Sequence, residues 1–230
     1  MRLSAAIRQD INFQFRHGFY HAYGILTIIY ILLLRVLPET LVYPAVTLIL
    51  FTDICALGFF FIGAIVLLEK GQNLTDSLFV TPLRLHEYLL SKLLSFMVLS
   101  FVSAVFIVVG GGAWGQDMLW FGMGVILSAG IYTLFGLIFA ARARHVNDYF
   151  VRALGIGLLI SLPVIAYLGL FDSEIFYLFP TRATLILLDV LDTDYSLGEK
   201  AYAILSLFVW GILMSGFAYQ RFEKYVRHPA

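Results

Sequence analysis

The chain has 230 residues, of which 61% are hydrophobic and only 13% are charged, and its formal net charge is zero. Several apolar stretches reach the roughly 20 residues that an α-helix needs to cross a bilayer. This composition excludes an ordinary soluble domain and predicts an all-α polytopic membrane protein.

The first 17 residues predict an amphipathic helix with basic flanks. Apolar side chains recur every four residues on one face, and polar side chains fill the other. The apolar set is Leu3, Ile7, Ile11 and Phe15, and the polar set is Arg8, Asn12 and Arg16. We expect this helix to lie at the membrane interface, in the headgroup region. A soluble helical tail is the alternative.

Six membrane spans follow, and together they predict one transmembrane domain with no room for a second, soluble one. The spans are residues 19–37, 44–68, 93–112, 118–141, 153–171 and 202–219. Residues 19–219 therefore form the predicted bundle, and residues 220–230 form a tail.

The basic residues divide unequally between the two sides of this arrangement. One side holds Arg2, Arg8, Arg16, Lys70, Arg84, Lys92, Arg142, Arg144, Arg152, Arg221, Lys224 and Arg227, and the other holds Arg35, Arg182 and Lys200. Because loops rich in Lys and Arg stay in the cytoplasm, the bias places both termini and residues 69–92 on the cytoplasmic side of the cell membrane.

Residues 69–92 form the longest polar interruption between two spans, and they carry helical signals. Leu74 and Leu78 lie four positions apart, which places them on one face of a short helix. Thr81 and Pro82 then predict an N-cap and a first helical residue for the helix that enters the next span. A short cytoplasmic helix with an exposed apolar face indicates a docking surface. Contact with lipid headgroups or with the inner ends of neighbouring spans is the alternative.

The outer segment of residues 172–200 is too long and too apolar for a simple loop. Pro180 separates two apolar stretches, residues 175–179 and 184–191. We expect two short re-entrant helices that are covered by the bundle or by a second copy. Alternatively, residues 175–179 extend the fifth span.

Asp53 lies about ten positions into the second span, roughly 15 Å deep at 1.5 Å per residue, and hence near the midplane of the bilayer. A carboxyl group at this depth indicates a place in a substrate pathway, together with the nearby Phe59 and Phe60. The alternatives for Asp53 are a structural hydrogen bond or the N-cap of a helix that begins after Thr52. For the phenylalanines they are packing or contact with lipid.

Motifs for nucleotide, metal or hydrolytic chemistry are not found in the sequence. It has no phosphate-binding G-x-x-x-x-G-K-[ST] loop, no H-E-x-x-H and no G-x-S-x-G. We therefore expect no catalytic residue, no bound cofactor and no metal in this chain.

The order of motifs around the second span resembles the ABC-2 type permeases, the membrane subunits of ATP-binding-cassette exporters, and more narrowly their fluoroquinolone-export group. The motifs are Asp53-Ile54, Gly58-Phe59-Phe60-Phe61-Ile62-Gly63, Glu69-Lys70, Thr81-Pro82-Leu83-Arg84, Glu87-Tyr88-Leu89, Lys92 and the later Tyr177-Leu178-Phe179-Pro180-Thr181. The architecture covers the whole chain, whereas the specific motifs lie mainly between Asp53 and Lys92.

The resemblance implies a coupling helix at residues 71–80 that inserts into the ATPase subunit, an interfacial connecting helix at the start, and re-entrant helices before the last span. The implied ATPase-coupling residues are Leu74, Thr75, Asp76, Leu78 and Phe79. Their implied support is Glu69, Thr81, Pro82, Arg84, Glu87 and Lys92, of which Glu69, Glu87 and Lys92 are expected to form charge pairs.

The implied partners are two copies of an ABC ATPase, which would carry ATP and Mg, a second permease that is identical or a sibling, and the lipid bilayer, but no nucleic acid. The expected function is outward transport of an amphiphilic, drug-like small molecule. The alternatives are an ATP-independent secondary transporter, which a single midplane carboxylate and the lack of an internal repeat disfavour, and a membrane scaffold or assembly protein.

Overall fold

A computed structural model describes residues 2–72, 84–115, 117–143 and 145–227, with side chains described as far as Lys224. Every regular element in these ranges is a helix, which confirms the predicted all-α class. Five of the helical segments are long and apolar enough to cross a membrane.

The chain begins with α1 (Arg2–Arg16) and turns into α2 (Phe19–Val36) at Gly18. Gly18 has φ 78°, a conformation that glycine adopts without the steric cost of a Cβ atom. Only 11% of the residues in the most apolar stretch of α2 are buried by the rest of the protein. The predicted helix and first span are therefore confirmed as helices, and α2 is attached to the bundle along a narrow face.

The second crossing is a continuous helical segment, residues 39–71, that contains a π-helical turn. It comprises α3 (Glu39–Cys55), the π-helix η1 (Ala56–Phe61) and α4 (Ile62–Gly71). Gly58 of η1 crosses α7 at Gly136, where a Cβ atom on Gly136 would lie 2.0 Å from the Gly58 carbonyl oxygen. Two glycines therefore permit the close backbone approach at this crossing.

Three further long helices complete the five: α6 (Leu85–Gly111), α7 (Met118–Arg142) and α11 (Leu197–Arg227). α6 begins later than the sequence predicts, because Arg84 is extended and its backbone N–H donates to Glu87 Oε2 at 2.8 Å. Arg84 thus takes the N-cap position of α6, three residues after the predicted cap at Thr81, and Thr81 and Pro82 themselves lie outside the described residues. At its other end α6 stops at Gly112, which has φ 80°.

The predicted fifth span, residues 153–171, is not one continuous helix. α8 (Val146–Ile160) ends at a turn, and α9 (Val164–Tyr167) follows after Pro163. Proline has no backbone N–H and cannot continue the hydrogen bonds of a helix. A sixth crossing would therefore have to combine α8 and α9 across this turn.

Two short helices occupy the predicted outer segment: the 3₁₀-helix η2 (Glu174–Leu178) and α10 (Pro180–Asp189). Nearly all of α10 is buried, and its threonines bond to α7. The Thr181 hydroxyl lies 2.9 Å from the Tyr132 hydroxyl, and Thr184 lies 2.9 Å from Ser128. Short helices on both sides of Pro180 are thus confirmed, although the Ile175 and Leu178 side chains are exposed.

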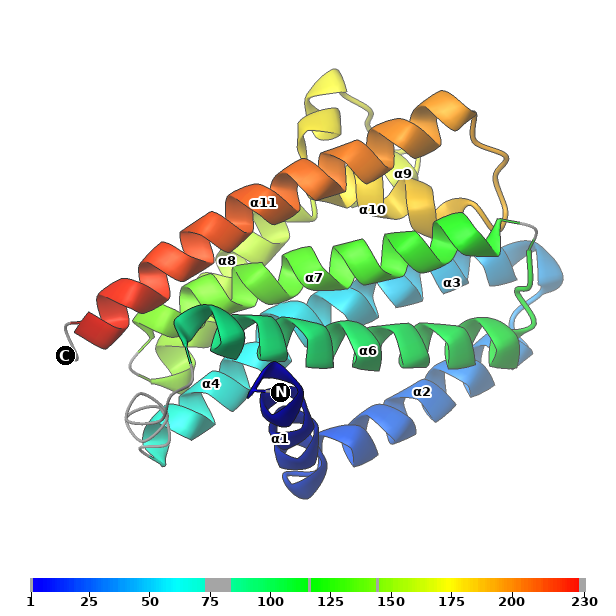
Figure 1. Cartoon of the computed structure of the whole chain (residues 1–230). Coiled ribbons are helices and arrows are strands. Elements are labelled where there is room, and N and C mark those ends of the chain that lie inside the picture. Colours follow the sequence, from blue (N-terminus) through cyan, green and yellow to red (C-terminus); the bar gives the residue numbers. More distant parts are fainter. Residues whose placement is uncertain (1, 73–83, 116, 144, 228–230) are drawn as a thin grey trace.

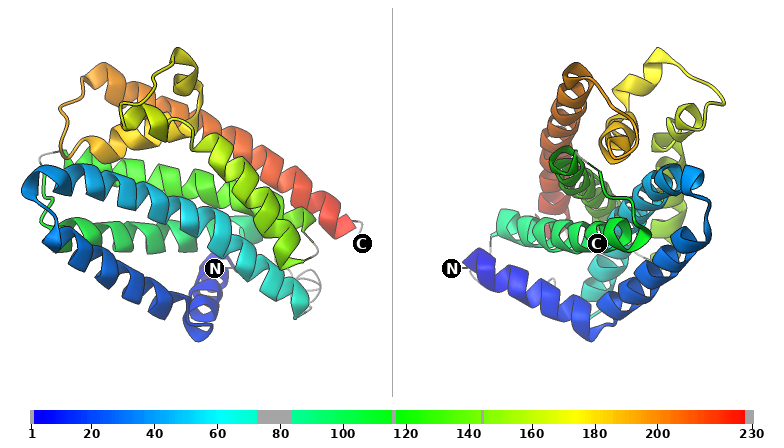
Figure 2. Two further views of the ribbon diagram at one scale, coloured as in Figure 1. Left: turned by 180° about the vertical axis from the view of Figure 1, so that it is seen from behind. Right: turned by 90° about the vertical axis from the view of Figure 1, so that its right-hand side faces the viewer.

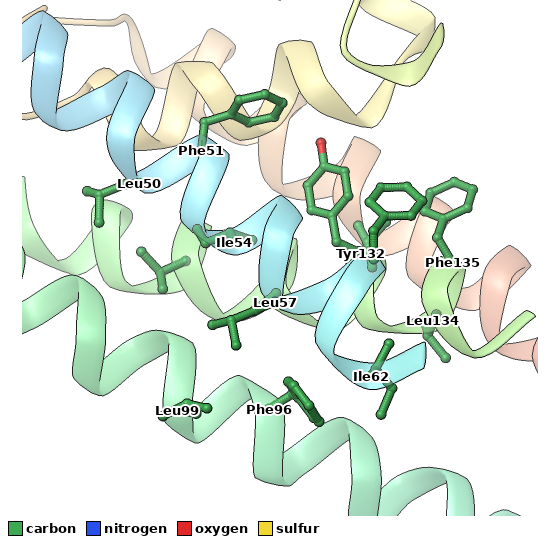
Figure 3. Packing of buried hydrophobic residues seen from close by; sticks show 14 of the residues in the cluster. Leu50, Phe51, Ile54, Leu57, Ile62, Phe96, Leu99, Tyr132, Leu134 and Phe135 are labelled. Atoms are coloured by element: carbon green, nitrogen blue, oxygen red, sulfur yellow. The ribbon is translucent and has the colours of Figure 1, made fainter. Parts of the chain in front are cut away.

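Figures 1 and 2 show the long helices running lengthwise, whereas α1 runs across them close to the end where α4 stops and α6 begins. This end is called the α4–α6 end below. α7 is the most enclosed of the five long helices, since 72% of the residues in its most apolar stretch are buried. Side chains from η1, α6 and α7, including Leu57, Phe96 and Tyr132, pack together in the core (Figure 3).

Candidate functional site

Three buried charged side chains meet at the α4–α6 end, and they come from three separate helices. Lys92 lies in the first turns of α6, Glu69 near the end of α4 and Asp10 in α1. The Lys92 Nζ atom lies 2.5 Å from Asp10 Oδ1 and 2.5 Å from Glu69 Oε1, and its side chain is only 1% exposed. A single ammonium group therefore joins α1 to both helices that flank residues 73–83.

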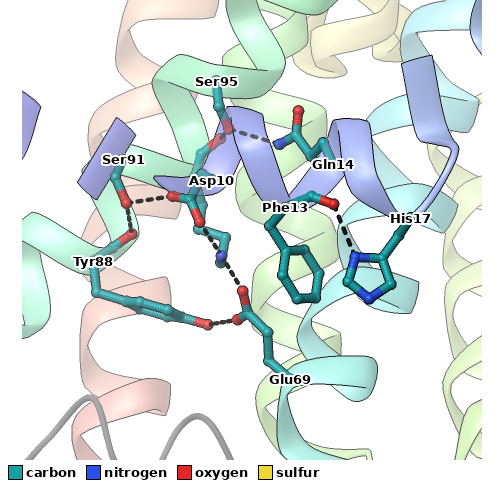
Figure 4. Close-up of polar contacts among 9 residues, drawn as sticks. Asp10, Phe13, Gln14, His17, Glu69, Tyr88, Ser91 and Ser95 are labelled. Carbon is teal, nitrogen blue, oxygen red and sulfur yellow. Dashed lines mark hydrogen bonds and ion pairs between the residues drawn. The ribbon is translucent and has the colours of Figure 1, made fainter. Parts of the chain in front are cut away.

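The two remaining carboxylate oxygens also accept hydrogen bonds (Figure 4). The Ser91 hydroxyl donates to Asp10 Oδ2 at 2.6 Å, and the Tyr88 hydroxyl donates to Glu69 Oε2 at 2.8 Å. Asp10, Glu69, Tyr88, Ser91 and Lys92 are called the Lys92 cluster below. Because buried charges cost several kcal/mol unless they are paired and hydrogen-bonded, this full set of partners is what makes the cluster tolerable inside the protein.

α1 docks on the bundle through polar side chains. Its buried residues are Asp10 and Gln14, and the Gln14 side-chain amide donates to the Ser95 hydroxyl of α6 at 2.9 Å. Phe15, which the sequence assigns to the apolar face, is 56% exposed. The predicted helix is present, and its place at the membrane interface stays a prediction. The face that it turns to the bundle is centred on Asp10 and Gln14, which the sequence analysis did not single out.

The predicted supporting residues have different positions in the structure. Glu69 and Lys92 form the expected charge pair. The Glu87 carboxylate accepts a hydrogen bond from the backbone N–H of Arg84 and thereby caps α6. Among the described contacts, it has none with the Lys92 cluster. The remaining predicted coupling and support residues lie outside the described residues: Leu74, Thr75, Asp76, Leu78, Phe79, Thr81 and Pro82.

Asp53 is buried between α3, α2 and α6 and is 1% exposed. The Ser103 hydroxyl of α6 donates to its Oδ2 atom at 3.3 Å, and the Tyr23 hydroxyl of α2 donates to its backbone carbonyl at 3.4 Å. The Oδ1 atom has no hydrogen-bond partner among the described residues. α3 continues through Asp53 to Cys55, so the alternative of a helix start after Thr52 is wrong.

Phe59 and Phe60 do not lie with Asp53. Phe59 is 2% exposed and stacks on Phe135 of α7 with ring centroids 5.8 Å apart. Phe60 stacks on Phe150 of α8 at 5.4 Å. In this conformation both rings are engaged in packing, on a different side of the helix from the Asp53 carboxyl. Their place in a substrate pathway stays a prediction.

A second buried carboxyl group, Asp189, lies at the end of α10 and was not singled out by the sequence. It accepts hydrogen bonds from the hydroxyls of Thr47, Tyr167 and Tyr195, at 3.3, 2.7 and 2.9 Å. Burial, together with the neighbouring Asp189 carboxylate, raises the pKa of Tyr195. Tyr195 thus stays a neutral donor, and this cluster ties α3 and α9 to the segment before α11.

Comparison with known proteins places the whole arrangement in one family. A model of the fluoroquinolones export permease protein family matches residues 1–229. The chain belongs to this family. It is 30% identical to the fluoroquinolones export permease protein of Mycobacterium tuberculosis over 228 residues, in strain CDC 1551 / Oshkosh and in strain ATCC 25618 / H37Rv. Each alignment covers 98% of this chain and 96% of the relative.

The matched range, residues 1–229, covers the parts of the chain in which the Lys92 cluster and Asp53 lie. The relatives are named as transport proteins and not as enzymes. Together with five helices of spanning length, membership of this family identifies the chain as an integral membrane permease.

Proposed function

We propose that this chain is the transmembrane subunit of an ABC exporter that moves an amphiphilic, drug-like small molecule out of the cell. The observation that carries the proposal is the match of the whole chain to a family of export permeases. In this proposal residues 1–230 form one transmembrane domain in the cell membrane with both termini in the cytoplasm, as the distribution of Lys and Arg favours.

The energy would come from another chain, because this sequence has no phosphate-binding loop of its own. Two copies of an ATPase, each with ATP and Mg, would bind a pair of permeases that are identical or siblings. Residues 71–80 would be the contact with the ATPase. The Lys92 cluster supports this assignment, since it fixes both helices that flank these residues at a single ammonium group.

The substrate pathway would include Asp53. Its carboxyl group is buried, its hydrogen bond from Ser103 is long at 3.3 Å, and one oxygen lacks a partner among the described residues. A carboxyl group that is costly to bury and poorly satisfied is more useful for binding than for holding helices together. The relatives are named for fluoroquinolone export, and we propose a drug-like substrate of comparable size and amphiphilic character for this permease.

The decisive experiment changes Leu74 and Leu78 together to Asp in a preparation that contains the permease and its candidate ATPase. Burying a leucine is worth about 1.5 to 3 kcal/mol, so two charges at these positions should release the ATPase or uncouple its hydrolysis from transport. Membrane insertion and permease pairing should persist because no span is altered.

The matched control changes Asn147 and Gln220 to Asp, which adds the same charge at exposed polar positions outside the proposed contact. The control should copurify with the ATPase and transport normally. If the leucine variant also keeps its ATPase and its transport, the contact is elsewhere. Transport by the wild-type permease without nucleotide would favour a secondary transporter, and no transport at all would favour a scaffold.

A further inference from the structure

We infer that a groove between α7, α8 and α11 binds one anionic phospholipid of the cytoplasmic leaflet, with the lipid phosphate held by arginine side chains. The groove has a volume of about 400 Å³. This volume lies within the range of roughly 300 to 1,000 Å³ that is typical of small-molecule sites. A lipid site goes beyond the proposed function, because it requires no ATPase and its occupancy can be measured on the permease alone.

Three arginines line the groove, each from a different helix. Arg142 is the last residue of α7, Arg152 lies in α8, and Arg221 lies near the end of α11. Arg152 is paired with Asp148 at 2.9 Å, whereas Arg142 and Arg221 are in no ion pair among the described residues. These four groups leave an excess of two positive charges at the groove. Because a guanidinium group presents paired N–H donors that match phosphate oxygens, the groove is suited to a phosphodiester.

The rest of the groove is largely apolar, and its apolar side chains lie deeper in the bundle than the arginines. On α7, Ile138 and Phe139 come about one turn before Arg142. On α8, Ile156 comes about one turn after Arg152. Since α7 ends where α8 begins, both of these turns lie on the membrane side of the arginines. A phosphate held by the arginines would therefore leave its acyl chain against apolar side chains.

The groove lies at the end of the bundle that the distribution of Lys and Arg places in the cytoplasm. Figures 1 and 2 show the start of α8 and the end of α11 at the same end of the molecule as the end of α4. The adjoining face of α8 is apolar, since Val151 is 73% and Leu154 is 53% exposed. Lipid tails are as apolar as such side chains, so a lipid can approach the groove from the side. Anionic lipids are found in the cytoplasmic leaflet, and basic pockets between membrane helices on that side bind their headgroups.

One glycine in the groove allows the site to be blocked without a change of charge. A Cβ atom on Gly155 would meet no heavy atom within 4 Å, so a leucine can replace this lining residue and extend into the groove. Gly157 of the same helix has equally open surroundings but does not line the groove. Gly155→Leu and Gly157→Leu are therefore a matched pair, of which only the first narrows the site.

Binding is measured by native mass spectrometry of the purified permease in detergent. Phosphatidylglycerol is the anionic probe, and phosphatidylcholine with the same acyl chains is the neutral one. The wild type should bind one phosphatidylglycerol and prefer it by roughly tenfold or more, because each arginine near an anionic headgroup strengthens binding about fivefold. Gly155→Leu should weaken phosphatidylglycerol binding roughly tenfold by a steric clash, and Gly157→Leu should weaken it less than about twofold.

A second pair of variants tests the arginines. Arg142→Gln with Arg221→Gln should abolish the preference for phosphatidylglycerol, because it removes the two guanidinium groups that are in no ion pair. Arg8→Gln with Arg16→Gln, the control, removes the same charge from exposed positions of α1 and should keep the preference. None of these four arginines is buried, so thermal unfolding without added lipid should match the wild type in both variants.

Inorganic phosphate distinguishes a lipid from a free anion. At millimolar concentration it should not displace phosphatidylglycerol, because it cannot contact the apolar part of the groove. Displacement by phosphate, equal binding of the two lipids, or wild-type binding in Gly155→Leu would each overturn the lipid site. An arginine variant that keeps its lipid preference but loses a copurifying ATPase would also overturn it, since the arginines would then belong to a protein contact. The lipid measurements need neither transport nor an ATPase, so a failure of the proposed function would leave them unchanged.

Discussion

The permease buries charge in two places, and the two differ in how well the charge is satisfied. In the Lys92 cluster every carboxylate oxygen has a partner at 2.5 to 2.8 Å, and an ammonium group stands between the two carboxylates. At Asp53 the hydrogen bond from Ser103 to Oδ2 is 3.3 Å long, and Oδ1 has no partner among the described residues. The two sites are buried to a similar degree. Among the described residues, however, hydrogen-bond partners are complete for the carboxylates of the Lys92 cluster and incomplete for Asp53.

The difference indicates that the two sites have different roles in the permease. A buried ion pair with all its hydrogen bonds holds helices in one geometry and is expensive to break. A carboxyl group near the middle of a span that lacks such partners is expensive to keep, so its use should lie in what it binds during transport. We therefore expect changes in the Lys92 cluster to affect folding and coupling, and changes at Asp53 to affect transport.

The largest effect is expected from Lys92→Met, which leaves two buried carboxylates without their cation. Breaking a buried pair by removing one partner typically costs about 3 to 5 kcal/mol, so little folded protein should accumulate. Thermal unfolding of the purified permease measures this loss. Arg152→Met is the matched control, since its ion pair with Asp148 is exposed and should be worth under about 1 kcal/mol.

The triple variant Asp10→Asn, Glu69→Gln and Lys92→Met sharpens the same point. It removes all three charges together, and replacement of a whole buried ionic group is often neutral for stability. Folding should return while transport per ATP stays low. Full recovery of coupling would show that the charges matter only for stability.

A smaller effect on the protein and a clear effect on transport are expected from Asp53→Ala. Folding and ATPase association should persist, because Asp53 makes only weak hydrogen bonds in the folded state. Expression, oligomer size and transport are measured together. Wild-type transport would remove Asp53 from the substrate pathway, whereas a collapsed oligomer would give it a structural role.

The smallest effect is expected from Tyr132→Phe, which removes a neutral buried hydrogen bond between α7 and α10. Thr181 keeps its bond to the Ile160 carbonyl at 2.7 Å, so no partner is left unsatisfied. Hydrogen bonds between membrane helices average about 0.6 kcal/mol, and the loss should be of that size. Thermal unfolding gives the value, and a loss as large as that of Lys92→Met would show that charge is not what distinguishes the cluster.

Hydrophobic patterning predicts most of the architecture from the sequence. Five spans, the helix at the start and the short helices around Pro180 follow from apolar length, period and helix breakers. The break in the fifth predicted span could have been read from Pro163, but the apolar residues on both sides of it obscured the boundary. The start of α6 was misplaced because the bond from Arg84 to Glu87 acts as a cap that the sequence does not make obvious.

The Lys92 cluster could be predicted only in part. Glu69 and Lys92 stand close to the ends of their spans and carry opposite charge, which suggests a pair. Asp10 and Gln14 were missed because an amphipathic helix is analysed by its apolar face, and their partners are more than 80 positions away in the chain. Their spacing of four residues was the available signal, since it places two polar groups on one side of α1.

The most direct test of the account measures the distance between α1 and α6 by pulsed electron paramagnetic resonance. Spin labels at the exposed positions Gln9 and His86, in a Cys55→Ser background, report on the two helices in the complex of permease and ATPase. The account predicts one narrow distance that ATP and vanadate leave unchanged, and a broad distribution when Asp10→Ala is added. A wild-type distance that shifts on nucleotide binding would show that α1 moves independently of α6, which contradicts the role of the Lys92 cluster in holding the two helices in one geometry.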